Sequence, residues 1–342
     1  MKLTFEQLKA ITTGAVSIEK EDSGVRFYRF NQEQRSVYQR RVQYLEEKLR
    51  STAGIQLFFQ TDSSLLFLRA TVSKGSATNH FSFDLFVNGK HIDSLENYLQ
   101  PASEESGGKA FYAMGTYEKS FSLGPGTKDV CLYFPWSVAT VVEELSLDDN
   151  ASLIPMIPEK KLLVYGDSVT HGNTTRYSCN HYIPQLARAM NVQVRNKAIA
   201  GSSTFPELAQ LESPYDPDYV LVAYGSNDWD RYEEVFFEET YRKMMQIIAD
   251  KYPRAQVFAV SPIWRADQDK RDRKMGPLAT IEKNIREIAA DHPNVTVISG
   301  IDLVPHDLQH FADAGLHPND AGYGLFFQNL WPKIKAALKD RA

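Results

Sequence analysis

The 342-residue sequence has only two cysteines, no long apolar run and no excess of basic residues. Cys131 and Cys179 fit neither a disulfide framework nor a metal-binding spacing, so we interpret them as packed free thiols. No window approaches the roughly 20 apolar residues of a membrane span, and the sequence therefore predicts no membrane partner. The net charge of −5 argues against a broad phosphate-binding surface, and hence against a nucleic-acid partner.

A secretion signal is also missing from the sequence. The N-terminal stretch from Met1 to Gln7 carries an acid early and contains no apolar run of signal length. We therefore expect a cytoplasmic protein, although a chain trimmed of its signal would read in the same way. The length is sufficient for two domains, and nothing in the sequence indicates an oligomeric state.

Strand-like patterns fill the chain from residue 55 to about 147. Short runs rich in β-branched and aromatic residues are separated by turn signals such as Asn88-Gly89. The expected strands are Ile55–Gln60, Ser64–Val72, His80–Val87, Tyr117–Leu123, Asp129–Phe134 and Thr140–Leu147. Their close spacing predicts an all-β sandwich or jelly roll as an accessory domain over residues 1–150. Residues 31–50 carry a weak helical stripe, and the sequence leaves open whether they form a helix.

From about residue 160 the pattern changes to strands that alternate with helices. The expected strands are Lys161–Tyr165, Val192–Lys197, Tyr219–Tyr224, Gln256–Val260 and Val295–Ser299. The expected helices are His181–Met190, Phe236–Lys251, Leu278–Ala290 and a last one over residues 319–338. This alternation predicts an α/β domain over residues 160–342, with a mostly parallel sheet and helices on both faces. Residues 149–160 are the expected linker.

Small and polar residues follow the predicted strands of this second domain. Ser168 comes after the first strand, Gly201 after the second and Asn227 after the third, and His317 precedes the last helix. Ligands of open α/β sheets lie beyond the carboxyl ends of the strands. We therefore expect these four residues to meet at one edge of the sheet.

Their chemistry fits nucleophilic attack on an ester. A serine hydroxyl needs a nearby base, and His317 would take the proton of Ser168 and later give it to the leaving alcohol. The attack builds an oxyanion, which requires fixed donors. The backbone N–H groups of Ser168 and Gly201 and the side-chain amide of Asn227 are the candidates. Taken alone, Ser168 would equally suit a helix N-cap, and we expect Asp167 to structure the turn rather than to react.

Four blocks of residues 160–342 resemble those of the SGNH (GDSL-like) hydrolase superfamily, in the same order: Gly166-Asp167-Ser168, Gly201, Gly225-Ser226-Asn227-Asp228 and His317-Pro318. The resemblance implies a three-layer α/β/α fold and ester hydrolysis without a metal or other cofactor. It also implies functional roles for Ser168, Gly201, Asn227 and His317. The two-part layout is similar to that of carbohydrate esterases, including acetyl esterases, with an N-terminal β-rich domain. This similarity implies a small-molecule or glycan ester as substrate and a short acyl group, such as O-acetyl, as the group removed.

One position departs from the family pattern. The family usually has an aspartate three residues before the histidine, where this sequence has Ala314, and Asp313 lies one residue earlier. A one-residue bulge would still aim Asp313 at the imidazole, and we take Asp313 as the third catalytic residue. A backbone carbonyl and Asp302 are the alternatives, since some group must fix the tautomer of the histidine.

The substrate contacts are predicted from position alone. Trp229 and Tyr165 lie beside the motifs and are candidates to stack on a sugar ring, with core packing as the alternative. His171 is a candidate pocket residue. His306 and His310 are four apart but lack the glutamate of a zinc protease motif, so no metal site is predicted. The rival functions are a carbohydrate-binding or assembly protein with an inactive hydrolase domain, and a lipase or thioesterase of the same superfamily.

Overall fold

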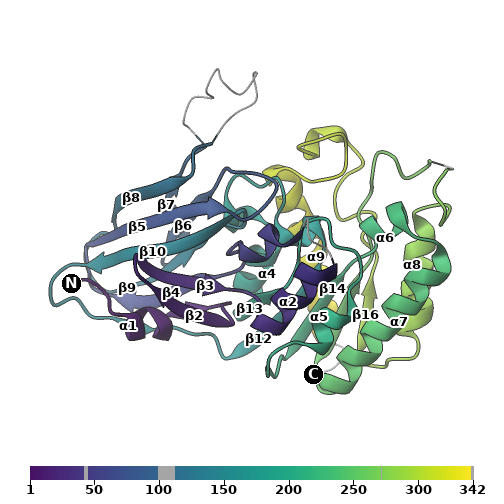
Figure 1. Cartoon of the computed structure of the whole chain (residues 1–342), viewed down its shortest axis with the longest axis horizontal. Coiled ribbons are helices and arrows are strands. Elements are labelled where there is room, and N and C mark those ends of the chain that lie inside the picture. The colour runs from purple at the N-terminus through teal and green to yellow at the C-terminus, as the bar shows by residue number, and fades with distance from the viewer. Residues whose placement is uncertain (42–44, 99–111, 271, 340–342) are drawn as a thin grey trace.

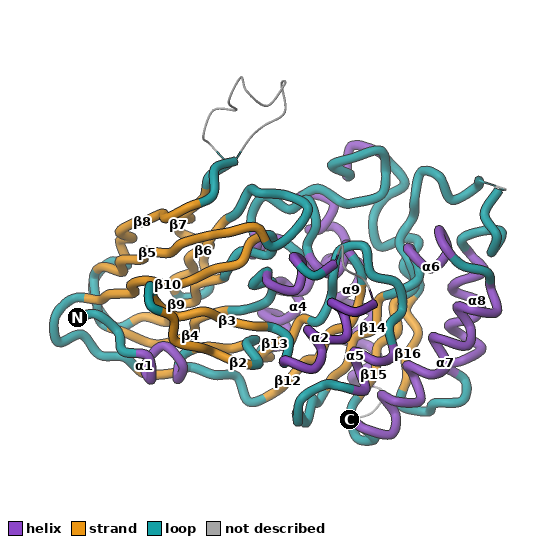
Figure 2. Tube along the Cα trace, in the orientation of Figure 1, coloured by secondary structure: helices purple, strands orange, loops and turns teal. Residues whose placement is uncertain are grey.

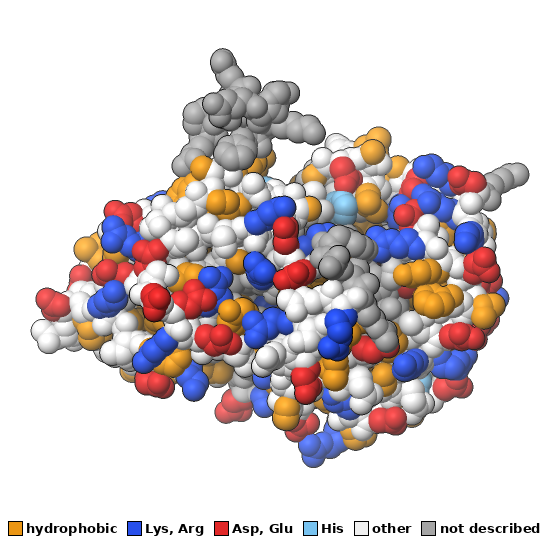
Figure 3. Space-filling model, viewed as in Figure 1, with side chains coloured by type: hydrophobic (Ala, Val, Ile, Leu, Met, Phe, Trp, Pro, Cys, Tyr) orange, Lys and Arg blue, Asp and Glu red, His pale blue; other side chains and the backbone are white. Residues whose placement is uncertain are grey.

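A β-rich part and an α/β part lie side by side in the computed structural model, which describes residues 1–41, 45–98, 112–270 and 272–339 (Figure 1). Strands dominate the first part, whereas strands and helices alternate in the second (Figure 2). No helix in the described ranges is long and apolar enough to cross a bilayer. Basic and acidic side chains are mixed over both parts of the face in Figure 3.

The β-rich part is a sandwich of two antiparallel sheets. The first sheet has the order β1 (Thr12–Thr13), β4 (Gln56–Thr61), β9 (Lys128–Tyr133), β6 (Ser82–Val87) and β7 (Lys90–Glu96), with β11 (Ile154–Pro155) paired to β4. The second has the order β2 (Ser17–Glu21), β3 (Gly24–Tyr28), β10 (Val138–Leu147), β5 (Leu65–Lys74) and β8 (Gly115–Ser122). Alternate residues of both sheets, such as Phe59 and Leu66, share one buried core. The expected β-sandwich is confirmed, and it also carries a short helix, α1 (Phe5–Ala10).

The α/β part is built on a five-stranded sheet in which all neighbouring strands are parallel. Its order is β13 (Val192–Asn196), β12 (Lys160–Gly166), β14 (Tyr219–Ala223), β15 (Gln256–Val260) and β16 (Val295–Ile298). β13 pairs with one edge of β12, and the next strand in the chain, β14, pairs with the opposite edge, so the strand order reverses at β12. Parallel sheets bind ligands at such a switch point, beyond the carboxyl ends of the strands.

Helices cover both faces of the parallel sheet. Successive strand residues point to opposite faces, so Leu162 and Val164 of β12 pack in one apolar cluster and Leu163 and Tyr165 in another. The first cluster includes α4 (Tyr182–Met190) and α9 (Asp320–Lys339). The second includes α5 (Pro206–Gln210), α7 (Glu234–Lys251) and α8 (Ala279–Ala289). The three-layer α/β/α fold is therefore confirmed.

A segment from the beginning of the chain packs with the α/β part. It contains α2 (Gln32–Arg41) and the 3-10 helix η2 (Glu47–Arg50). Phe30, Tyr38 and Leu49 lie in the same apolar cluster as α7 and α8. The chain thus contributes to the core of the α/β part before it forms most of the sandwich.

Candidate active site

Ser168 lies at the tight junction between β12 and the short helix α3 (Ser168–His171). Asp167 caps this helix, because its carboxylate accepts the Val169 N–H at 3.1 Å. The preceding Gly166 has no room for a side chain, since a Cβ would lie 2.6 Å from the side chain of Thr170. The junction therefore holds Ser168 at the carboxyl edge of the sheet, close to the switch point.

A second turn, over residues 313–317, holds His317. Gly315 has a φ of +88°, and its N–H donates to the Asp313 carbonyl oxygen at 2.7 Å. The Oδ1 atom of Asp313 accepts the N–H groups of Leu316 and His317 at 2.8 and 3.0 Å. The chain turns back tightly enough to absorb the extra residue, so a carboxylate four positions before His317 reaches the ring.

Ser168, His317 and Asp313 form one hydrogen-bonded chain. The Ser168 Oγ lies 2.8 Å from His317 Nε2, and His317 Nδ1 lies 2.5 Å from Asp313 Oδ2. Burial works to raise the pKa of Asp313, but hydrogen bonds from the His317 ring and from two backbone N–H groups outweigh it and lower the pKa to about 2. An ionised carboxylate accepts the Nδ1–H, which leaves Nε2 free to accept the serine proton.

The loop after β13 carries a free backbone donor. Gly201 has a φ of +87°, in the left-handed region that favours glycine. The N–H groups of Ile199, Ala200 and Ser202 all have partners. The N–H groups of Gly201 and Ser168 have none among the described residues. Unoccupied N–H groups are what a developing oxyanion requires.

Asn227 ties a third segment to this loop. It lies in the short helix α6 (Ser226–Arg231), which directly follows β14. Its Nδ2 donates to the Ser202 carbonyl oxygen at 3.0 Å. This bond uses one of the two amide hydrogens, and the other is available to a ligand.

Two buried carboxylates support the same loops. Asp228 accepts the Thr204 N–H with both oxygens, at 3.0 and 3.2 Å. Burial raises the pKa of Asp228 to about 7 and the pKa of Asp167 to about 6. Both carboxyl groups therefore bind protons more readily than exposed ones, and each accepts a hydrogen bond from a backbone N–H group.

The side chains of the three predicted substrate contacts are fully buried in the structure. Trp229 packs in the core, and its Nε1–H donates to the Gly276 carbonyl oxygen at 2.7 Å. Tyr165 points from β12 into the helical layer that contains α7. His171 lies 2.8 Å from the Ser51 hydroxyl through Nε2 and accepts the Ala200 N–H through Nδ1. Core packing, the alternative for the aromatic pair, is what the structure shows.

Asp302, the alternative orienting acid, forms a 3.5 Å contact with His306 and is largely exposed.

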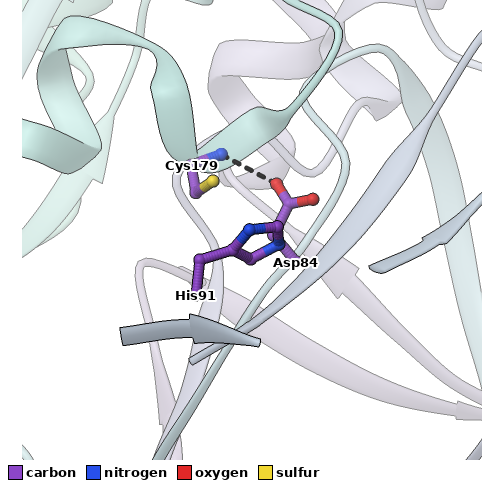
Figure 4. Close-up of side chains that lie close together, drawn as sticks. All are labelled: Asp84, His91 and Cys179. Carbon is purple, nitrogen blue, oxygen red and sulfur yellow. Dashed lines mark hydrogen bonds between the residues drawn. The ribbon is translucent and has the colours of Figure 1, made fainter. Parts of the chain in front are cut away.

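In the described part of the chain, one group of possible metal ligands lies together: Asp84, His91 and Cys179, whose ligand atoms are within 4.8 Å of one another (Figure 4). Asp84 already accepts the Cys179 N–H and the hydroxyls of Ser82 and Ser94. We interpret the carboxylate as a brace between β6 and the 3-10 helix η4 (Ser178–Asn180), because its oxygens are satisfied without a cation.

Two basic residues that no motif indicated bind the loop around Gly201. Arg231 donates to the Gly201 carbonyl oxygen and Lys48 to that of Ala200, both at 2.7 Å. Arg231 lies one helical turn after Asn227, and this spacing could have drawn attention to it. Lys48 lies 152 positions before its partner, and no local pattern signals such a contact.

Comparison with known proteins gives one family and a shared fold. The GDSL-like Lipase/Acylhydrolase family matches residues 164–325, a stretch that contains Ser168, Gly201, Asn227 and His317. No curated protein sequence matches the chain.

Similar solved structures cover nearly the whole chain. The salicylyl-acyltransferase SsfX3 from a tetracycline biosynthetic pathway is 20% identical, with a TM-score of 0.78 over 95% of this chain and 94% of that one. A family two carbohydrate esterase from Clostridium thermocellum is 15% identical, with a TM-score of 0.65 over 96% and 99%. The acetyl xylan esterase Est2A from the rumen bacterium Butyrivibrio proteoclasticus is 13% identical, with a TM-score of 0.63 over 99% and 98%. At these identities the likeness shows the fold, including its β-rich N-terminal part. Residues 164–325 of the chain therefore form a GDSL-like lipase/acylhydrolase domain.

Proposed function

We propose that the protein is a serine esterase that removes short O-acyl groups, in particular O-acetyl groups of carbohydrates. The observation that supports this most directly is the hydrogen-bonded chain from Ser168 through His317 to Asp313. A hydroxyl, an imidazole and a carboxylate in this order are the working parts of a serine hydrolase.

The proposed reaction has two steps. The Ser168 Oγ attacks the ester carbonyl carbon while His317 Nε2 takes its proton. The bond to the leaving oxygen then breaks, and His317 returns the proton to the departing alcohol. A water molecule, deprotonated by the same nitrogen, hydrolyses the acyl-enzyme and releases the acid. Asp313 stays ionised throughout and holds the ring in the required tautomer.

The negative charge of each tetrahedral intermediate falls on the former carbonyl oxygen. We assign its stabilisation to the N–H groups of Ser168 and Gly201 and to the side-chain amide of Asn227. The two backbone donors have no other partner among the described residues. Each donor of this kind typically contributes about 100- to 1000-fold in rate.

The substrate class is proposed by analogy. A family two carbohydrate esterase and an acetyl xylan esterase share the fold over both parts of the chain. The likeness to a salicylyl-acyltransferase supports a second candidate, acyl transfer. The acyl-enzyme would be the same, and an alcohol would replace water as the group that attacks it.

The test compares the wild type with Ser168→Ala and a matched control, Ser299→Ala. Ser299 also follows a strand of the parallel sheet, but its hydroxyl donates to Glu282. We expect Ser168→Ala to lower kcat for p-nitrophenyl acetate by about 1000-fold or more, with the control close to wild type.

Acetate release from acetylated glycans, measured with and without an added alcohol acceptor, then separates hydrolysis from transfer. Acylated acceptor as the main product would favour the acyltransferase. Equal rates for wild type and Ser168→Ala would exclude the serine mechanism and leave the binding-protein alternative.

A further inference from the structure

Three side chains form hydrogen bonds with the backbone of Ala200 and Gly201. The Lys48 ammonium donates to the Ala200 carbonyl oxygen at 2.7 Å. The Arg231 guanidinium donates to the Gly201 carbonyl oxygen at the same distance. The Ala200 N–H in turn donates to His171 Nδ1 at 3.1 Å. Of the four backbone N–H and C=O groups of Ala200 and Gly201, the Gly201 N–H alone has no hydrogen-bond partner in the described ranges.

The carbonyl that Lys48 binds belongs to the same peptide group as the Gly201 N–H. A trans peptide group is planar, so its C=O and N–H point in opposite directions. Fixing the oxygen toward Lys48 therefore fixes the N–H toward the opposite side of the loop. The positive charge also polarises the peptide group, which makes its N–H a stronger donor.

Lys48 is itself anchored to the loop that it binds. Its carbonyl oxygen accepts hydrogen bonds from Arg29 and from the Ser51 hydroxyl, at 3.2 and 3.1 Å. The buried Arg29 guanidinium also donates to the carbonyl oxygens of Asn196 and Ala198, at 2.7 and 3.0 Å. The backbone of η2 is thereby tied to the strand end from which the Gly201 loop begins.

The second cation stands close to the first. Burial lowers the pKa of Lys48, and the charge of Arg231 lowers it further. Arg231 forms no ion pair with any acid in the described part of the chain, and it is exposed. Two positive charges that bind adjacent carbonyl oxygens repel each other, which destabilises the folded protein. Proteins tolerate such unfavourable arrangements mainly at functional sites.

We infer that Lys48, from the N-terminal part of the chain, is a positioning residue that sets the direction and strength of the Gly201 N–H as an oxyanion donor. Arg231 holds the following peptide in the same way. The inference rests on the proposed function, in which Gly201 receives the negative charge of the intermediate. It makes Arg29 and Lys48 part of the support of the active site rather than of a separate accessory module.

The kinetic test uses Lys48→Met, Lys48→Gln and Lys48→Arg, with Arg50→Met as the control. Arg50 lies on the same 3-10 helix but points to Glu46 and is exposed. We expect Lys48→Met to lower kcat for p-nitrophenyl acetate by about 10- to 100-fold while KM changes little, since a misplaced donor weakens the transition state more than the bound substrate. Inactivation by diethyl p-nitrophenyl phosphate, which needs the same oxyanion donors, should slow in parallel. Lys48→Gln should lower kcat and the inactivation rate by less than Lys48→Met does, and Lys48→Arg should retain most of both rates.

A second readout does not depend on catalysis. Hydrogen exchange of a peptide covering residues 198–203, followed by mass spectrometry, should accelerate in Lys48→Met and Lys48→Gln but not in Arg50→Met. Unchanged exchange together with kcat values equal to the control would overturn the inference. Accelerated exchange in a protein whose Ser168→Ala variant keeps full activity would instead leave the positioning of the loop standing and reject the esterase mechanism. If Lys48→Met does not fold, Lys48→Gln and Lys48→Arg carry both measurements.

Discussion

Replacing Asp313 with asparagine tests the orientation of His317. The carboxylate accepts three hydrogen bonds in the 313–317 turn, two from backbone N–H groups and one from the ring. An asparagine side chain is nearly isosteric but carries no charge, and its amide can present NH₂ as well as oxygen to the ring. When NH₂ faces Nδ1, the ring proton moves to Nε2, and Ser168 loses its proton acceptor.

The size of the effect follows from the electrostatics of the pair. A lowering of the Asp313 pKa from 3.8 to about 2 corresponds to about 2.4 kcal/mol. The side chain is 37% exposed, so solvent screening reduces this to about 1 kcal/mol. Loss of the charge alone would then slow the reaction by about fivefold, and loss of tautomer control adds to it. We expect kcat to fall by about 100-fold or more, with KM nearly unchanged.

The assay measures kcat and KM for p-nitrophenyl acetate with wild type, Asp313→Asn and Asp302→Asn. Asp302 is the matched control, because it pairs with the exposed His306 rather than with His317. A fall of less than about tenfold in Asp313→Asn, or an equal fall in Asp302→Asn, would refute the assigned role of Asp313.

The same substitution has a predicted pH signature in stability. The folded pKa of Asp313 lies below its unfolded value, so its contribution is present above about pH 4 and is lost as the pH falls toward 2. In urea unfolding, Asp313→Asn should therefore be less stable than wild type at pH 6, and the two should converge by about pH 2. A difference that stays constant over this range would contradict the linkage.

Three further substitutions separate structural from functional roles. Trp229→Phe should lower the thermal midpoint without changing KM for a glycan ester, because the indole is buried and bound to Gly276; a KM effect at unchanged stability would restore Trp229 as a substrate contact. Gly201→Ala should cost about 1–2 kcal/mol in urea unfolding, because its φ of +87° disfavours a side chain, and kcat should fall with it; wild-type stability would contradict the strain. Lys197→Met should cost about 3 kcal/mol in the same assay, since it removes a partner from the buried Glu212 carboxylate 3.0 Å away; a cost below about 1 kcal/mol would show that Glu212 is satisfied without it.

The sequence predicted most of the buried strands because their residues either alternate between apolar and polar or are apolar throughout. The expected strand Gln256–Val260 has the same bounds as β15, and Asp129–Phe134 differs from β9 by one residue at each end. The strands β2 and β7 were missed, since they are largely exposed edge strands rich in charged residues.

The site residues that could be predicted from the sequence are those whose location follows from the order of strands and helices. Ser168, Gly201 and Asn227 follow strand ends, and the topology of a parallel sheet gathers strand ends at one edge. The aromatic contacts were not predictable in this way, because a residue beside a motif can point into either helical layer. Tyr165 immediately precedes Gly166 yet faces the core. Lys48 was out of reach because only the tertiary fold brings it to Ala200.

The position of residues 29–41 and 45–51 affects how the chain can be divided. A cut in the expected linker, residues 149–160, would take Phe30, Tyr38 and Leu49 away from the apolar cluster beneath α7. The truncated C-terminal half would expose the surface that these side chains cover, and it would also lose Arg29 and Lys48, which bind the carbonyl oxygens of Ala198 and Ala200. We therefore expect that fragment to aggregate and to be inactive. A transplant of the hydrolase half onto another protein would have to bring this early segment with it.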